Sequence, residues 1–410
     1  MPDLFDIQPI DRFAGESQPV KRPKEFACFS YDDNHEFHLG DSSLRWYYPP
    51  QLGTDLSQGF ESFDKHDGSQ DEHIDSLLKA IIAHEQEVGK KIDSQIVTWR
   101  GMMTKIMSSP FEDRDGYVRY NGEPRTGYRL HVCMTTSAAP FDILQADFTL
   151  SFIEENHAYK QASMQEQQDR QNAGNRRRNQ PQFSPEVMTF WEGYKFETLS
   201  TLPATWGETS REYIENRDKE TVSNKAQYCS IVRTGLGKSI LCLGGEVDAT
   251  TKPAVMGAKP HRKGAPINWV ELKTSAAIQN ERGMQNFERK LMKFWIQSFL
   301  LGVPNIIVGF RDQGGILRKI EEIRTESIPA KAKQRNVQSW NADMCINFAS
   351  GFLDWLRQVI NDDGVWRIRR APGSKQIEVT RVEEAGHGKI LTDDFINWRI
   401  KLSLDEDRKH

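Results

Sequence analysis

The segments Leu241-Cys-Leu-Gly-Gly-Glu-Val-Asp248 and Trp269-Val-Glu-Leu-Lys-Thr274 each begin with apolar residues and run into charged ones. Short apolar runs of this kind, bounded by glycine or charge, predict strands of a buried sheet. Residues two apart on a strand point to the same side, so Glu246 would share a face with Asp248, and Glu271 with Lys273. We therefore expect two strands to carry charged side chains out of a sheet core toward one site.

These acids predict a bound cation. Two carboxylates roughly 6.6 Å apart repel by about 2.5 kcal/mol at an effective dielectric near 20, and Glu197 in Gly193-Tyr-Lys-Phe-Glu197 adds a further charge. On an exposed face water would screen the repulsion, and the pairs would be ordinary surface charges. Their apolar neighbours favour the cation site. Hard cations prefer oxygen ligands, which predicts Mg²⁺ or Mn²⁺, with two ions as our hypothesis, whereas zinc favours histidine or cysteine.

The spacing of apolar residues predicts an α+β fold of mixed β-sheets packed together and flanked by helices. Strands are predicted at residues 26–31, 44–48, 95–100, 128–134, 148–153, 191–198, 228–234, 239–243, 267–274 and 304–309. Helices are predicted at residues 72–87, 280–301 and 341–360. Arg100 would then stand where the strand at 95–100 meets a further helix, predicted by the spacing of Met102, Met103, Ile106 and Met107. Gln297 would lie within the helix at 280–301.

We expect one catalytic domain over residues 26–400. An extended tail would precede it at residues 1–25, and a second tail would follow at 401–410. Residues 165–182 are rich in Gln, Asn and Arg and predict a disordered loop. Within it, Arg176-Arg-Arg178 fits a solvated insertion better than an RNA contact.

The sequence Gly235-Leu-Gly-Lys-Ser239 looks like the end of a phosphate-binding P-loop. That motif needs a glycine where this chain has Val232, and it should lead into a helix, whereas a strand is predicted here. We interpret these residues as a hairpin turn.

Composition excludes several classes of protein. The 54 basic residues nearly balance the 58 acidic ones, so any nucleic-acid contact must come from a local patch. The five cysteines form no Cys-x-x-Cys pair, which argues against a zinc ribbon or a secreted disulfide scaffold and favours a reducing compartment. No apolar run approaches the roughly 20 residues that span a bilayer, so no membrane association is expected. Lys21-Arg-Pro-Lys24 is a weak indication of nuclear import.

An acid followed 23 residues later by Glu271-Leu-Lys273 resembles the PD-(D/E)xK nuclease superfamily. The flanking motifs narrow the resemblance to the DXO family of decapping exoribonucleases, and the resemblance extends over about Trp46 to Trp398. These motifs are Gly193-Tyr-Lys-Phe-Glu197, Gly245-Glu-Val-Asp248, Val270-Glu-Leu-Lys-Thr274, Thr98-Trp-Arg-Gly101 and Phe294-Trp-Ile-Gln-Ser-Phe299. The resemblance implies a PD-(D/E)xK nuclease-like core.

The resemblance also implies roles for individual residues. Metal ligands would be Glu197, Asp248, Glu271 and the carbonyl of Leu272, with Glu246 acting through a metal-bound water. Lys273 and Gln297 would place the attacking water and the scissile phosphate. Arg100 would hold a phosphate near the RNA 5′ end, which suits its bidentate fork. From the residues alone, the favoured interpretation is a surface ion pair for Arg100 and an ordinary polar helix position for Gln297.

The function implied by the resemblance is hydrolysis at aberrant RNA 5′ ends. It includes removal of pyrophosphate from 5′-triphosphates, release of incomplete or NAD caps, and 5′–3′ degradation in some members. The family includes a fungal partner of the nuclear 5′–3′ exoribonuclease, which implies the nucleus as location. An alternative is that the chain mainly binds and stimulates that exoribonuclease. A DNA nuclease of the wider superfamily fits the family-specific words poorly.

Overall fold

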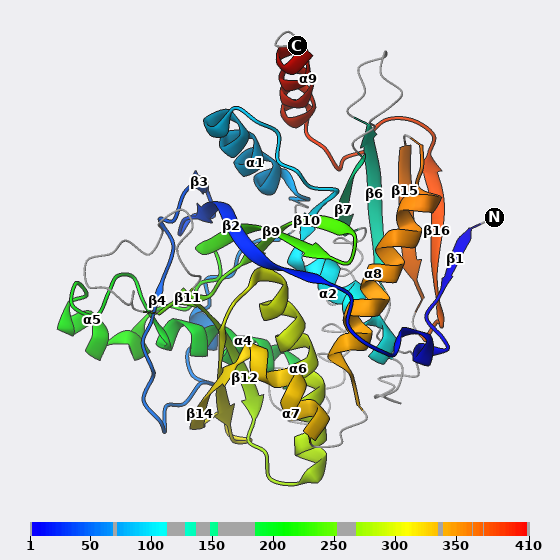
Figure 1. Ribbon diagram of the computed structural model, residues 1–410. Coiled ribbons are helices and arrows are strands. Elements are labelled where there is room, and N and C mark those ends of the chain that lie inside the picture. Colours follow the sequence, from blue (N-terminus) through cyan, green and yellow to red (C-terminus); the bar gives the residue numbers. More distant parts are fainter. Residues whose placement is uncertain are drawn as a thin grey trace, which may run out of the picture.

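The computed structural model describes residues 2–68, 72–112, 128–136, 148–154, 185–251, 268–334, 339–362, 364–371 and 373–407. Within these ranges the strands form two mixed sheets, and helices lie between the sheets and on the outer face of the larger one (Figure 1). The predicted fold class is confirmed. Among the described residues, no helix combines the length and apolar character needed to cross a membrane.

The larger sheet has the order β1-β16-β15-β6-β7-β5-β10-β9-β2-β3. β5 runs parallel to both β7 and β10, and the other neighbours are antiparallel. The bounds in sheet order are Asp3–Asp6, Gln376–Glu383, Gly364–Arg370, Tyr128–Thr136, Phe148–Glu154, Ile96–Trp99, Ser239–Glu246, Gln227–Leu236, Val20–Tyr31 and Phe37–Leu39.

The smaller sheet has the order β14-β13-β12-β11-β4-β8. β12 runs parallel to β13 and β11 runs parallel to β4, while the remaining pairs are antiparallel. The bounds in sheet order are Leu317–Arg324, Asn305–Arg311, Trp269–Ala276, Ala249–Thr250, Trp46–Tyr47 and Thr201–Leu202.

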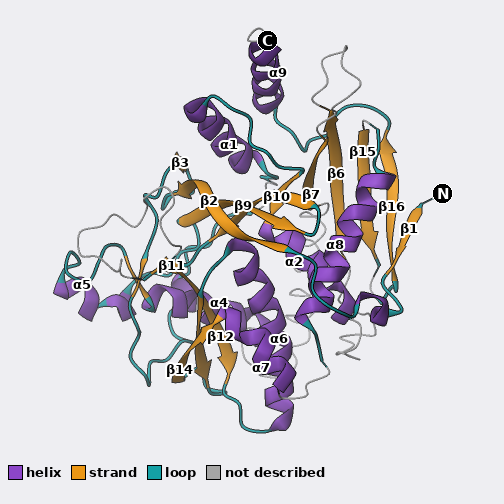
Figure 2. Cartoon of the chain, in the orientation of Figure 1, coloured by secondary structure: helices purple, strands orange, loops and turns teal. Residues whose placement is uncertain are grey.

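Helix α6 lies between the sheets, because it contacts β9 and β10 of one sheet and β12 and β13 of the other. Helices α2 and α8 pack beside it, whereas α1 and α9 lie together against the opposite face of the larger sheet (Figure 2). The helix bounds are α1 Asp75–Val88, α2 Arg100–Ser108, α4 Pro185–Leu199, α5 Arg211–Glu215, α6 Glu281–Leu301, α7 Ile328–Gln334, α8 Ala342–Val359 and α9 Asp393–Asp407.

Successive side chains along a strand point to opposite faces of the sheet, so residues of one strand join cores on both faces. On β10, Leu241 and Leu243 join the core around α6 and α8, while Cys242 joins the core beneath α1. On β12, Val270 and Leu272 join a third core with Phe196 of α4. Glu271 and Lys273 alternate with these two residues, so they point to the opposite side of the sheet, toward α6 and the larger sheet.

The predicted helices and the predicted hairpin are confirmed. The Asn280 side chain caps α6 by accepting from the Gly283 amide at 2.8 Å, and Gly302 ends the helix with a φ of 76°. Strand β10 follows the turn at Gly237, as expected for a hairpin rather than a P-loop.

Residues 191–198 belong to helix α4, so the predicted strand was wrong. The inward side of α4 carries Glu192, Lys195, Phe196 and Leu199, which have helical spacing. Two of these four are buried charged residues with a polar partner: Glu192 pairs with Arg311 at 2.6 Å, and Lys195 donates to the Asp218 carbonyl at 2.8 Å. Because they are charged, the helical period does not show in the apolar residues alone.

Residues 1–25 are not an extended tail. β1 pairs with β16 near the other end of the chain, and β2 begins at Val20 and pairs with β9. Short strands of mixed polarity carry little local signal, and distant partners stabilise them. At the C-terminus, α9 continues to Asp407 and includes most of the predicted tail. The predicted loop at 165–182, with Arg176-Arg-Arg178, lies outside the described residues.

Candidate active site

The charged residues of the predicted site meet between the two sheets. Arg100 is the first residue of α2 and directly follows β5 of the larger sheet, whereas Glu271 and Lys273 lie on β12 of the smaller sheet. Glu246 ends β10, and the chain crosses to β11 of the other sheet through Val247 and Asp248. The expectation that Glu246 and Asp248 share a strand face was therefore wrong, because the crossing between sheets ends the alternation.

Glu271 is at the centre of the contacts. Its side chain is 0 % exposed, with Oε2 at 2.9 Å from Arg100 Nη1 and Oε1 at 2.7 Å from Lys273 Nζ. Lys273 Nζ also lies 3.9 Å from Asp248 Oδ2. That same Asp248 oxygen accepts from the amide of Leu272 at 2.5 Å. The structure thus brings Arg100, Asp248, Glu271, Leu272 and Lys273 into one set of contacts.

Glu271 and Asp248 differ in protonation. Burial alone would raise the pKa of Glu271, but Arg100 and Lys273 outweigh burial and hold that pKa at about 2. Burial raises the pKa of Asp248 to about 7, reinforced by the charge of Glu271 and opposed by Lys273. Glu271 is therefore ionised at neutral pH, and Asp248 is poised between its two forms.

The other two acids lie within electrostatic reach. Burial, followed by the charges of Asp248 and Glu246, raises the pKa of Glu197 well above its usual range. Burial also raises the pKa of Glu246, opposed by Arg100. Burial lowers the pKa of Arg100, but Glu271, Asp248 and Glu246 outweigh it, so the net shift is upward.

This donor set fits a divalent cation. Four carboxylates (Glu197, Glu246, Asp248 and Glu271) face two cations (Arg100 and Lys273), so two formal negative charges remain when all six are ionised. Buried carboxylates whose pKa values are raised by one another are stabilised by a hard divalent ion, which takes oxygen ligands. The set contains no histidine or cysteine, as the sequence indicated.

Gln297 lies one helical turn before Leu301 on α6. A Cβ added to Gly245 would come within 2.7 Å of Leu301 Cδ1 and 3.1 Å of Arg100 Cβ, so Gly245 permits the close approach of α6 and α2 beside Glu246. Residues four apart share a helix face, so Gln297 lies on the same side of α6 as Leu301.

Two neighbours of the centre did not emerge from the sequence. Tyr194 has a raised pKa because of burial, with added effects of Glu246 and Glu197. The positive charge of Arg45 opposes the rise in the pKa of Glu197. Arg45 Nε also donates at 2.9 Å to Thr201 Oγ1, which in turn donates to the Glu197 carbonyl at 3.0 Å. The position of Tyr194 inside Gly193-Tyr-Lys-Phe-Glu197 was an available signal, whereas Arg45 had none.

Comparison with known proteins agrees with this geometry. The family model described as RAI1 like PD-(D/E)XK nuclease matches residues 21–121 and 136–396. The decapping nuclease RAI1 of Gibberella zeae is 60% identical over 400 residues, covering 98% of this chain and 97% of that protein.

Solved structures extend the similarity. Candida albicans Rai1 in complex with pU5-Mn²⁺ has a TM-score of 0.80 and 30% identity, covering 98% of this chain and 100% of that one. Scheffersomyces stipitis Rai1 in complex with (3′-NADP)⁺ and calcium has a TM-score of 0.77 and 26% identity, covering 94% and 98%. These relatives confirm the expected hydrolase class and the expected divalent-metal cofactor. The chain belongs to the family of RAI1-like PD-(D/E)XK nucleases, the relationship that its motif words indicated.

Proposed function

We propose that the chain hydrolyses RNA 5′ ends with Mg²⁺ or Mn²⁺. Its substrates would be 5′-triphosphate RNA, which loses pyrophosphate, and RNA with incomplete or NAD caps, with 5′–3′ degradation as a further activity. One observation carries the proposal: the buried Glu271 contacts both Arg100 and Lys273 within a set of four acids. Carboxylates that would bind a metal and cations that would bind a phosphate thus lie in one site.

Each residue has a role in this proposal. Glu197, Asp248, Glu271 and the Leu272 carbonyl would hold metal, and Glu246 would act through a water. Lys273 and Gln297 would orient the attacking water and the scissile phosphate, and Arg100 would hold a phosphate near the 5′ end. Bound Mg²⁺ or Mn²⁺ lowers the pKa of a coordinated water and offsets charge on phosphate oxygens. Because RNA phosphates add negative charge to the two already in excess, two ions suit the centre.

The relatives support the choice of substrates. A Rai1 was solved with pU5, a short RNA, and another with (3′-NADP)⁺. These ligands agree with an RNA 5′ end and with an NAD cap, respectively.

The test uses 5′-triphosphate, NAD-capped and 5′-monophosphate RNAs with Mg²⁺ or with EDTA. Wild type should hydrolyse the 5′-triphosphate and NAD-capped RNAs with Mg²⁺ but not with EDTA. Asp248→Ala and Glu197→Ala should hydrolyse neither RNA. The matched control is Glu212→Ala, which removes an exposed acid of α5 outside the centre. Unchanged RNA in every wild-type lane would refute the proposal, as would equal loss in the control.

The proposal extends to a nuclear location and to a nuclear 5′–3′ exoribonuclease as partner, both supported by the family resemblance. Adding wild type or Asp248→Ala to that exoribonuclease separates binding from chemistry. Equal stimulation by both would assign the effect to binding, whereas no complex with either would remove the partner from the proposal.

A further inference from the structure

Arg45 lies where the segments that carry Glu197 and Asp248 meet. It directly precedes β4, which pairs with β8 on one side and with β11 on the other. β8 follows α4, the helix that carries Glu197 in its last turn, and β11 directly follows Asp248. The Arg45 carbonyl accepts from the amide of Thr250 on β11 at 2.9 Å. The backbone of Arg45 is therefore tied to the strand that follows one of the predicted metal ligands.

The side chain of Arg45 reaches the other segment. Its Nε donates at 2.9 Å to Thr201 Oγ1, and that hydroxyl donates at 3.0 Å to the carbonyl of Glu197. Thr201 is fully buried, and a hydroxyl has a single proton, so accepting from Arg45 leaves that proton for the helix. A cation beside the C-terminal turn of a helix also interacts favourably with the helix dipole. Arg45 thus connects β4 to the turn of α4 that bears Glu197.

Two further side chains hold the guanidinium of Arg45. Its Nη2 donates to the Tyr213 hydroxyl at 3.1 Å and lies 3.6 Å from Glu220 Oε1. The Tyr213 hydroxyl in turn donates to Glu220 Oε2 at 2.6 Å. The planar fork of an arginine can serve several acceptors in fixed directions. An ion pair with Glu220 explains the position of Nη2, but it does not explain why Nε is directed at Thr201.

We propose that Arg45 is a positioning residue that sets Glu197 relative to Asp248 for metal binding. The inference rests on the metal-binding part of the proposed function, because it takes these two acids as ligands. Arg45 acts through Thr201 and through β4, and together with Lys273 it opposes the rise in the pKa of Glu197. Groups that orient a ligand from outside the metal shell contribute to metal affinity, because they fix where the ligand oxygen stands.

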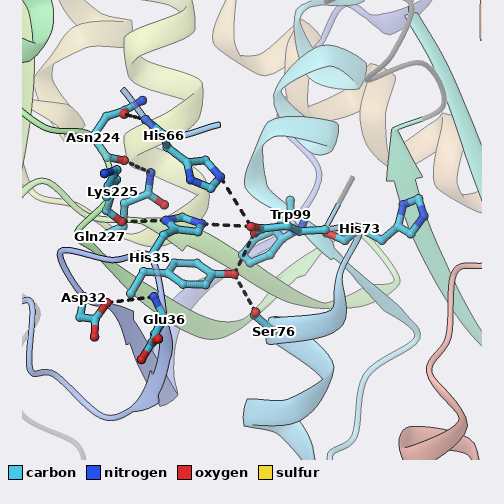
Figure 3. A network of polar contacts seen from close by, with 12 residues as sticks. Asp32, His35, Glu36, His66, His73, Ser76, Trp99, Asn224, Lys225 and Gln227 are labelled. Atoms are coloured by element: carbon cyan, nitrogen blue, oxygen red, sulfur yellow. Dashed lines mark hydrogen bonds and ion pairs between the residues drawn. The ribbon is translucent and has the colours of Figure 1, made fainter. Parts of the chain in front are cut away.

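A second polar network bears on Arg100 (Figure 3). The imidazoles of His35 and His66 stack with centroids 3.7 Å apart, and Glu72 Oε1 lies 3.1 Å and 3.7 Å from their respective Nε2 atoms. Trp99 Nε1 donates at 2.7 Å to the carbonyl of the residue that follows Glu72, and Trp99 directly precedes Arg100. The two networks therefore support different parts of the centre, one the proposed phosphate contact and the other the acid on α4.

The test titrates the full chain, stripped of metal and without RNA, with Mn²⁺, and measures free Mn²⁺ by its electron paramagnetic resonance signal. Arg45→Met should weaken Mn²⁺ binding by about 10–100-fold, the cost typical of losing an outer contact. Thr201→Val keeps the branched shape without the hydroxyl and should also weaken binding. The double variant should bind like Arg45→Met alone, because both changes break one path. Arg45→Lys keeps the charge and one donating group, so it should recover part of the affinity.

Arg211→Met is the matched control, because the Arg211 side chain is 89% exposed and pairs with Glu215 at 2.6 Å on α5. It should bind Mn²⁺ as wild type does. A purely structural Arg45 would lower the free energy of unfolding in urea and leave the Mn²⁺ affinity of the folded chain unchanged. Wild-type affinity in folded Arg45→Met or Thr201→Val, or an equal loss in Arg211→Met, would overturn the proposal. If Arg45→Met fails to fold, Thr201→Val decides, since it leaves Arg45 with Glu220.

Hydrolysis of 5′-triphosphate RNA by the same preparations separates this inference from the proposed function. A wild type that binds Mn²⁺ but leaves the RNA unchanged would refute the proposed hydrolysis, and the positioning role would still be decided by the Mn²⁺ affinities. An active wild type with unchanged affinity in folded Arg45→Met would refute the positioning role alone. A wild type that binds no Mn²⁺ would refute both.

Discussion

Glu85 and Glu271 are both fully buried glutamates that meet an arginine, yet their surroundings differ. Glu85 Oε1 accepts from the Ile92 amide at 2.8 Å and lies 2.8 Å from Arg399 Nη2. Its Oε2 accepts from Trp398 Nε1 at 2.9 Å. Donors therefore meet both oxygens, and they tie α1 to α9.

Glu271 is also paired, but with acids beside it. Arg100 and Lys273 contact its oxygens, while the charges of Asp248 and Glu246 act on the same two cations. Glu85 has a matched set of donors, whereas the centre around Glu271 has more acids than bases. Burial and an ion pair are thus common to both glutamates, and an excess of like charge distinguishes Glu271, the one that we propose binds metal.

Glu271→Gln should have the largest effect. Without this carboxylate the centre should lose metal and with it several kcal/mol of transition-state stabilisation. We expect single-turnover hydrolysis of 5′-triphosphate RNA to fall about 10⁴-fold, which is about 5.4 kcal/mol. Circular dichroism should show a folded chain. Activity within tenfold of wild type would make Glu271 a structural residue like Glu85.

Glu85→Ala should affect stability instead of chemistry. It leaves Arg399 and the Ile92 amide without their buried acceptor, so the free energy of unfolding in urea should fall by about 3–5 kcal/mol. Hydrolysis per folded molecule should be unchanged. The control is Gln86→Ala, an exposed neighbour on α1, expected within about 0.5 kcal/mol of wild type. A loss of turnover in the folded Glu85 variant would break the contrast.

The acid excess also predicts how metal stabilisation depends on pH. In the metal-free fold the pKa of Asp248 is raised to about 7, so the folded state binds this proton more tightly than the unfolded chain and loses stability as pH rises toward 7. Glu271, with a pKa of about 2, has the opposite sign and loses its contribution only below about pH 4.5. Metal binding needs ionised Asp248. As pH rises toward 7, the stabilisation that metal adds should therefore increase by up to about 1.4 kcal/mol per pH unit.

Thermal melting with Mg²⁺ and with EDTA at about pH 6 and about pH 8 measures this difference. The increment from Mg²⁺ should be larger at the higher pH. An increment that is independent of pH, or larger at the lower pH, would show that no proton is displaced from Asp248 by the metal.

The sequence predicted what local patterns encode. Apolar spacing located the helices and strands, and the order of acids located Glu271 and Lys273 on one strand face. Helix α4 escaped because Glu192 and Lys195 face inward with partners, Arg311 and the Asp218 carbonyl, that lie far away in the chain. In the sequence alone, a buried charged residue looks like a surface residue, because its partner is not known.

Features that depend on contacts between distant segments were beyond local reasoning. β1 is stabilised by pairing with β16, whose residues lie 370–376 positions further along the chain. The crossing at Val247 and Asp248 depends on the presence of two sheets. His35, His66 and Glu72 come from separate segments and meet only through the fold.

Gln297 should have the smallest effect and is the sharpest test of the resemblance. It shares a face of α6 with Leu301, which packs at Gly245, but the same position suits a polar residue with no chemical role. If it orients water or phosphate, Gln297→Ala should lower the single-turnover rate by about tenfold, or about 1.4 kcal/mol, with unfolding unchanged.

Gln285→Ala removes the same side chain from an exposed position more than three turns away on α6, and it should leave the rate at the wild-type value. Equal rates for the two variants would confine the chemistry to the charged residues, since the amide of Gln297 would then add nothing that water cannot supply. A loss specific to Gln297 would instead mean that a neutral donor from α6, the helix between the sheets, completes a centre built mainly from charged residues.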